Sequence, residues 1–241
     1  MGPIASFHLV SESTWRSPLA MARLGTDRFR LDRTPGLVFW RLLGTGRADD
    51  TGPGIDPRRT ALFAVWEGGS ALDDFLATSA IGRRWEALEE AWHVRLRSLG
   101  GHGRWRGVDP LAGLDTGDAT GPIAVVTRAD VRLGAWWSFA RAGRVVDREL
   151  HRAPGLIDVV GIGEAPIGRL ATFSLWDSME AARSFASSTP EHVDVVRRTR
   201  DEHWYREELF ARFEPFGSTG QWNGRDPLAD DARITERSPR S

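Results

Sequence analysis

The chain repeats itself, and this internal duplication limits its fold more than any other feature. Residues 103–111 read GRWRGVDPL and residues 220–228 read GQWNGRDPL, so six of nine positions are identical at an offset of 117. Further anchors follow in the same order: Pro35-Gly36-Leu37 recurs as Pro154-Gly155-Leu156, and Trp66 with Phe75 recurs as Trp176 with Phe185. A tandem duplication of roughly 115 residues explains these anchors together.

Each copy predicts the same order of elements. The first copy has strand patterns at 4–11, 37–43 and 60–66, a helix between Ser17 and Pro35, and a last extended stretch around Trp105. A second helix is expected from near Ser70, with Trp85, Leu88, Trp92 and Leu96 on one face at helical spacing. In the second copy the expected order is strand 122–132, helix 134–152, strands 156–162 and 169–176, a broken helix at 178–206 and strand 207–216.

The order β-α-β-β-α-β in each copy is that of the split βαβ, ferredoxin-like unit, an α+β fold with helices on one face of an antiparallel sheet. The other face stays apolar and uncovered, so a second copy can cover it. The sequence therefore predicts an α+β barrel within one chain. Its parts are a first unit at 1–118, a second unit at 119–229 and a charged tail at 230–241.

Composition excludes several classes of function. The net charge is -1, so no overall field attracts nucleic acid. The absence of cysteine excludes disulfides, iron–sulfur clusters, thiol nucleophiles and thiolate-bound haem. No stretch of about 18 apolar residues predicts a membrane span, and the N-terminal residues do not read as a signal peptide. A cytoplasmic location is expected.

Six histidines are the main candidates for metal binding or acid–base chemistry, and His192 has the most informative context. Thr189 reads as a helix N-cap, Pro190 as a first-turn proline and His192 as the third helical position. The positive end of the helix dipole disfavours the imidazolium form there, and neutral imidazole is the form that ligates metals. His203 is the rival, about 16 Å further along the same helix, so the two cannot bind one ion together.

Other motifs are weak. Glu90 and His93 form a single Glu-x-x-His, whereas a di-iron bundle needs two. Gly161-Ile162-Gly163 lacks the third glycine of a dinucleotide site and is interpreted as a turn.

The second copy resembles the spheroidene monooxygenase family, carotenoid-oxidising enzymes associated with haem. The matching stretches are IAVVTRADV at 123–131, GIGEAP at 161–166, TFSLWDS at 172–178 and PEHVDVVRRTRDEHWYREELFARF at 190–213. In the first copy, GLVFWRLLGTG, ALFAVW and GRWRG also look like the family, so the resemblance spans residues 4–228. The architecture is similar to that of the wider dimeric α+β barrel group, in which haem lies between sheet and helix.

The resemblance implies that His192 is the proximal iron ligand of a haem b. Gly82 stands at the matching position of the first copy, so only the second half can bind iron in this way, which implies one haem per chain. Arg128 is the candidate to pair with a haem propionate or to act as a distal donor. Phe173, Trp176 and Phe185 are candidates for the pocket wall, with core packing as the alternative for all three. Glu164 either stabilises a turn or reaches the site.

The expected function is a haem-dependent monooxygenase acting on a hydrophobic substrate, a carotenoid or another secondary metabolite. Nothing in the sequence predicts an NADPH or flavin site, so electrons would come from a ferredoxin-type donor or from peroxide. The alternatives are redox-neutral haem chemistry similar to that of aldoxime dehydratases, and a barrel that carries haem or an apolar ligand without catalysis. A homodimer and peripheral contact with a membrane stay open.

Overall fold

The computed structural model describes residues 2–13, 17–46, 56–164, 168–188 and 204–229. In the first half these form β1 (Ile4–Ser11), α1 (Ser17–Leu31), β2 (Leu37–Thr45), β3 (Asp56–Trp66), α2 (Gly69–Thr78), α3 (Ala80–Glu86) and β4 (Glu90–Gly103). The second half has β5 (Ile123–Val131), a short 3-10 turn (Leu133–Ala135), α4 (Trp136–Leu150), β6 (Leu156–Gly163), β7 (Arg169–Trp176), α5 (Met179–Ser188) and β8 (Tyr205–Gly220).

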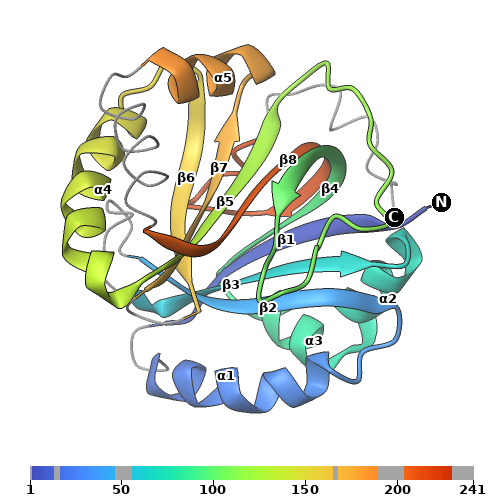
Figure 1. Cartoon of the computed structure of the whole chain (residues 1–241). Helices are drawn as coiled ribbons and strands as arrows, with labels where there is room; N and C mark the ends of the chain where they lie inside the picture. The colour runs from blue at the N-terminus through green and yellow to red at the C-terminus, as the bar shows by residue number, and fades with distance from the viewer. Residues whose placement is uncertain (1, 14–16, 47–55, 165–167, 189–203, 230–241) are drawn as a thin grey trace.

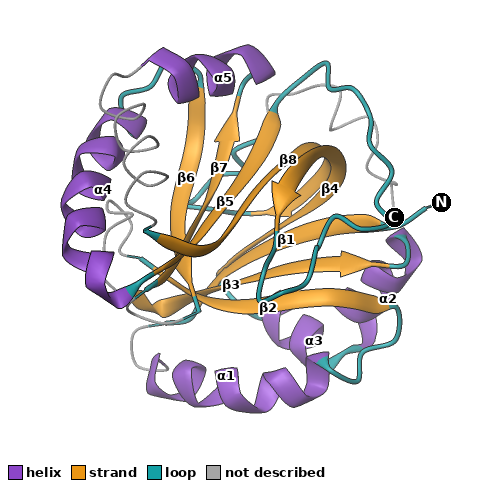
Figure 2. Cartoon of the chain, in the orientation of Figure 1, coloured by secondary structure: helices purple, strands orange, loops and turns teal. Residues whose placement is uncertain are grey.

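The eight strands close into one antiparallel barrel in the order β1-β3-β2-β6-β7-β5-β8-β4. Each half contributes a four-stranded sheet, β4-β1-β3-β2 and β8-β5-β7-β6, which is the strand order of a split βαβ unit. The α+β fold of tandem ferredoxin-like units is therefore confirmed. Figure 1 shows α1, α2 and α3 together outside one sheet and α4 and α5 outside the other, and Figure 2 shows the strands enclosed between them.

The prediction of one helix that carries Trp85, Leu88, Trp92 and Leu96 on one face is wrong. Helical structure ends at Glu86, and Trp92 and Leu96 lie on β4 with side chains inside the barrel. The helical part is also broken at Ser79, whose hydroxyl accepts the N–H of Gly82 at 2.8 Å and caps α3. Of the broken helix expected at 178–206, the structure describes α5 at Met179–Ser188; residues 189–203 lie outside the described residues, and β8 already includes Tyr205. Gly161 and Gly163, expected in a turn, lie on β6.

The barrel interior is a packed apolar core. Alternate residues of every strand point inward and form a single cluster. Phe7 of the first sheet stacks on Phe173 of the second with ring centroids 3.8 Å apart.

The two repeated nine-residue motifs close the ends of this core. Trp105 and Trp222 are fully buried in it, and each begins a hairpin turn whose next two residues have positive φ. Each turn is held by the other half: Glu207 of β8 accepts the N–H groups of Arg106 and Gly107 at 2.6 Å, and Glu90 of β4 accepts that of Asn223 at 2.6 Å. The repeated motif therefore stabilises the contact between the two halves.

The division into units at 1–118 and 119–229 stays a prediction, and the tail at 230–241 lies outside the described residues.

Candidate functional site

The outer face of the first sheet is sealed by its helices. At its centre lie four paired residues, Leu42, Leu62, His8 and His93, which we call the first central row. Leu42 and Leu62 belong to one apolar cluster shared with α2 and α3. His8 is buried and bonds to His93 through their Nδ1 atoms at 2.9 Å, and Trp85 of α3 stacks on His93. Large side chains therefore fill the space between this sheet and its helices.

The equivalent row of the second sheet has small residues at three of its four positions. Gly161, Thr172, Thr127 and Phe210, the second central row, are paired across β6, β7, β5 and β8 at the same level. Glycine and threonine thus replace leucine, leucine and histidine. Thr127 is exposed in the middle of a central strand, and Thr172 and Phe210 are half-buried. In the described residues, the second central row therefore carries smaller side chains than the first central row at three of its four positions.

The apolar packing on this face is correspondingly split in two. One cluster joins α5 and the end of α4 to Val125 and Trp176, and the other joins the start of α4 to Ala129 and Val131. Thr127 lies between these clusters along β5. We call the outer face around Thr127 the gap; residues 189–203, which follow α5 in the chain, lie outside the described residues.

Trp176 and Phe185 lie at the edge of this gap. Their ring centroids are 5.4 Å apart, and Nε1 of Trp176 donates to Ser174 at 2.9 Å. The duplicate pair, Trp66 and Phe75, makes the same contact at 5.1 Å. Because the pair also occurs in the sealed half, it packs helix against sheet in both copies. This favours core packing, the alternative considered for these two residues.

Phe173 lies on the opposite face of β7, inside the barrel, where Phe7 stacks on it. Its position agrees with core packing and keeps it away from the gap.

Arg128 also points inward, because it alternates with Thr127 along β5. Its side chain is 1% exposed and pairs with Glu207, with Asp130 at 3.4 Å and, more loosely, with Glu164 at 4.0 Å. These carboxylates already balance its charge at the Trp105 end of the barrel. The structure does not bring Arg128 together with Trp176 and Phe185.

Glu164 shares this end of the barrel with three arginines. Its carboxylate lies 3.6 Å from Arg41, 3.7 Å from Arg106 and 4.0 Å from Arg128, beyond ordinary hydrogen-bond length. Burial lowers the pKa of Arg41. The negative charge of Glu164 acts in the opposite direction but does not outweigh burial. Buried polar atoms in proteins normally have hydrogen-bond partners, yet within the described part of the chain none is found for Nε of Arg41, Nε of Arg128 or Oε2 of Glu164. Ordered water between these groups would satisfy them.

Arg212 is the cation that does lie on the outer face of the second sheet. It pairs in register with Val125, and its guanidinium contacts Sδ of Met179 at 3.9 Å and the ring of Phe210 at 5.9 Å. Its Nε is buried and has no hydrogen-bond partner among the described residues. A buried guanidinium N–H of this kind is available to a carboxylate of a bound ligand.

The expected iron ligand His192 and its rival His203 both lie outside the described residues. Within the part of the chain that is described, no three His, Asp or Glu side chains gather as a metal site.

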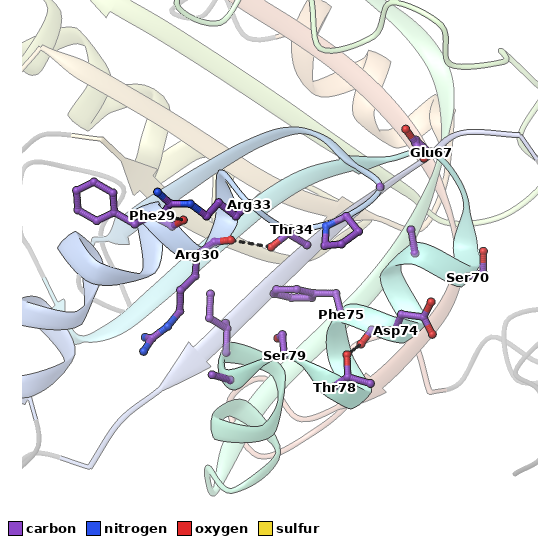
Figure 3. Close-up of a pocket in the computed structure, with 15 residues that line it drawn as sticks. Phe29, Arg30, Arg33, Thr34, Glu67, Ser70, Asp74, Phe75, Thr78 and Ser79 are labelled. Atoms are coloured by element: carbon purple, nitrogen blue, oxygen red, sulfur yellow. Dashed lines mark hydrogen bonds between the residues drawn. The ribbon is translucent and has the colours of Figure 1, made fainter.

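The first half has a cleft of about 800 Å³ on its helical side (Figure 3). The end of α1, with Arg30 and Arg33, forms one wall, and α2, with Asp74, forms the other. Phe75 lies at its floor, where it packs on Trp66. The cleft is open to solvent, and the first central row lies in the sealed core beneath these helices.

These features define a class: an intrachain α+β barrel of two ferredoxin-like halves with helices outside each sheet. Two solved structures share this fold. An aldoxime dehydratase crystallised with butyraldoxime has a TM-score of 0.58 and 13% identity, over 89% of this chain and 79% of its own. A second aldoxime dehydratase has a TM-score of 0.53 and 12% identity, over 88% and 81% of the two chains. At these identities the likeness shows the fold alone.

Sequence comparison identifies the family. The spheroidene monooxygenase of Rubrivivax gelatinosus is 35% identical over 79% of this chain and 73% of its own length. That of Rhodobacter capsulatus is 29% identical over 98% of both chains, and that of Cereibacter sphaeroides is 27% identical over 87% of this chain and 65% of its own. No family model matches the chain. The chain belongs to the spheroidene monooxygenase family, which places it among the monooxygenases, a class of oxidoreductase.

Sequence reasoning missed Thr127, Thr172 and Arg212. The signal was present in the duplication, because aligning β1 with β5 sets His8 opposite Thr127. A large residue in one copy and a small one in the other marks the copy that keeps space.

Proposed function

We propose that the chain is a haem-dependent monooxygenase of a hydrophobic substrate, with one haem b in the open layer between the second sheet and its helices. The observation that supports the proposal is the second central row, in which Gly161, Thr172 and Thr127 have small side chains and Thr127 is exposed on β5. Membership of the spheroidene monooxygenase family supports the reaction class.

The residues at the gap fit a haem. Its floor is Thr127 and Thr172, and the half-buried ring of Phe210 borders it. The unpartnered Nε of Arg212 could bind a propionate, a role for which Arg128 is already occupied by carboxylates. The flat, apolar macrocycle with carboxylates at one edge matches this combination.

His192 is proposed as the proximal ligand, from the helix-start pattern Thr189-Pro190-Glu191 that precedes it. Bound haem would supply the iron at which the oxidant is activated. The chain's own contribution is to hold neutral imidazole, to pair the propionate through Arg212, and to exclude water with the apolar clusters on either side of the gap.

The relatives are named for spheroidene, and we extend this to a carotenoid or another hydrophobic secondary metabolite as the substrate. Electrons would come from a ferredoxin-type donor or from peroxide. Consumption of oxygen or peroxide separates this reaction from redox-neutral haem chemistry and from simple haem carriage.

The test is an absorption titration of the protein with haem, comparing wild type with His192→Ala and His203→Ala. Wild type and His203→Ala are expected to give a Soret band that His192→Ala loses. Loss in His203→Ala alone would reassign the ligand, and no band in wild type would refute the haem.

A second pair of variants tests the gap itself. Thr127→Leu restores a large side chain and should weaken haem binding by at least about tenfold, because the added volume fills the space. Thr219→Leu is the matched control, since Thr219 is an exposed threonine of β8 on the first sheet's side of the barrel, paired with His93. Equal haem affinity in both variants would place the ligand elsewhere.

A further inference from the structure

Two large apolar side chains stand in solvent at the start of α4. Leu133 is 69% exposed and Trp137 is 81% exposed, the highest values among the large hydrophobic residues that the structure describes. Leu133 lies in the 3-10 turn that precedes α4 and Trp137 in the first turn of α4, so both belong to the start of this helix. Tryptophan is seldom left this exposed without a partner, since its ring carries much apolar surface.

We call this pair and its sequence neighbours the α4 tip, and the charged residues that the structure describes on either side of the pair along the chain, Arg132 and Arg141, are basic. Arg132 precedes Leu133 and Arg141 follows Trp137 by one helical turn, and both are exposed. Asp130, the nearest preceding carboxylate, is already paired with Arg128 at 3.4 Å and Arg169 at 3.5 Å. The tip therefore presents apolar side chains with cationic flanks, the combination that suits an anionic lipid surface.

The α4 tip also adjoins the open layer of the second half. Trp136, the neighbour of Trp137, is buried against Ala129 and Val131 of β5. Phe139, one turn later, packs edge-on against Tyr205 with ring centroids 5.9 Å apart. One tryptophan thus faces solvent and the next faces the apolar cluster at the border of the gap, so an apolar molecule leaving a bilayer here would meet that cluster.

We propose that Leu133 and Trp137 insert into the interface of an anionic lipid bilayer while Arg132 and Arg141 contact headgroup phosphates. This inference rests on the proposed function, because only an apolar substrate stored in membranes gives the contact a purpose. A second copy of the chain is the weaker alternative. Two side chains fall far short of the roughly 800 Å² per partner that a stable protein interface buries, whereas they suffice for shallow, reversible insertion.

Vesicle co-sedimentation tests the surface. Haem-loaded protein is incubated with vesicles of phosphatidylcholine alone or with one quarter phosphatidylglycerol. Wild type should bind the anionic vesicles, and the double variant Leu133→Ser, Trp137→Ser should lose roughly tenfold or more in partitioning. Arg132→Gln with Arg141→Gln should lose the preference for anionic lipid. Phe29→Ser is the matched control, because Phe29 is 65% exposed on α1 of the other half.

The absence of native cysteine allows a direct measurement of depth. A fluorophore sensitive to polarity is attached to Ser138→Cys at the α4 tip or to Thr26→Cys on α1, both exposed positions. The label at position 138 should shift to shorter wavelength on adding anionic vesicles, and the label at position 26 should not.

Three results would overturn the proposal: no vesicle binding by wild type, equal binding by the serine double variant, or a blue shift at position 26 as large as at 138. A dimer lost in the serine variant with unchanged vesicle binding would identify the tip as an interface between copies. Vesicle binding is also measured without haem, so a protein that binds membranes but shows no Soret band would refute the proposed function and leave this surface standing.

Discussion

The buried histidine pair of the first half predicts a dependence of stability on pH. Burial lowers the pKa of His93 to about 4, and burial together with His93 and Arg95 lowers that of His8 well below its ordinary value. In the unfolded chain both pKa values return to about 6.5. Below that pH the unfolded state binds protons that the folded state does not. As the pH is lowered from about 6.5 to 4, the free energy of unfolding should therefore fall by about 1.4 kcal/mol per pH unit for each histidine.

Urea unfolding at pH 8, 7, 6 and 5 measures this slope. The matched control is His8→Thr with His93→Phe, which copies Thr127 and Phe210 of the second half into the first. The variant should be less stable at pH 8 but lose the slope between pH 6.5 and 5. A slope that survives in the variant would assign it to other groups.

Glu207 and Glu90 offer a second comparison. Each accepts N–H groups of one of the two equivalent hairpin turns, which lie at opposite ends of the barrel. Burial raises the pKa of Glu207, but the N–H groups of Gly107 and Arg106 and the charge of Arg128 outweigh it, so the pKa is lowered. Glu207→Gln should cost about 2 kcal/mol of stability, because the buried Arg128 loses its nearest carboxylate. Glu90→Gln should cost less, since Arg59 keeps the side-chain oxygen of Asn223 at 2.8 Å. Equal losses in chemical denaturation would contradict this difference.

Among the elements, sequence periodicity predicted seven strands well and misassigned one. Leu88, Trp92 and Leu96 are four residues apart, a spacing compatible with one face of a helix and with every second inward position of a strand. The deciding signal was the strict alternation of Trp92, Val94 and Leu96 with His93, Arg95 and Arg97, which is a strand pattern. The candidate site was harder to predict from the sequence. Thr127 and Arg212 have ordinary sequence contexts, and only the strand register shows that both lie on the outer face of the second sheet.

The barrel has two seams, where a strand of the first sheet pairs with a strand of the second. They differ in the length of strand that is paired, and this difference predicts where the barrel opens. β4 and β8 pair from Trp92 and Gly220 to Gly103 and Leu209, whereas the described pairing of β2 with β6 covers Gly44 with Gly163 and Thr45 with Ile162. The N–H of Gly46 bonds to Gly161 across the short seam and that of Arg104 to Glu208 across the long one, both at 2.8 Å.

Hydrogen exchange at these two amides tests the difference. Each lies one residue past the end of its strand, so they are matched in position and bond length. Gly46 should exchange faster, because opening the short seam breaks fewer bonds. Equal protection of the two amides would show that the barrel opens as one unit.

At the scale of the whole molecule, duplication followed by divergence accounts for both the barrel and its asymmetry. The repeated motif predicted two similar halves, and the pairing of their inner faces follows from the apolar face that each sheet leaves uncovered. The division of labour could not be predicted, because it depends on a few substitutions such as His8 against Thr127. The first half fills its central row with large side chains, and the second half has small ones there, where we propose that haem binds.

The same architecture predicts that neither half folds alone. A separate first half would expose Phe7 and Phe63 to water, and a separate second half would expose Phe173 and Phe213. Each would also lose the carboxylate that holds its last hairpin turn, Glu207 for one and Glu90 for the other. Residues 1–118 and 119–241 expressed separately should therefore aggregate or lack cooperative unfolding, while co-expression should give a complex that co-purifies through a tag on one half. Glu207→Gln in the second fragment should weaken that complex, because the turn of the first fragment loses its acceptor. A single half that is soluble, monomeric and cooperatively folded would contradict the prediction, since its uncovered face would then need no partner.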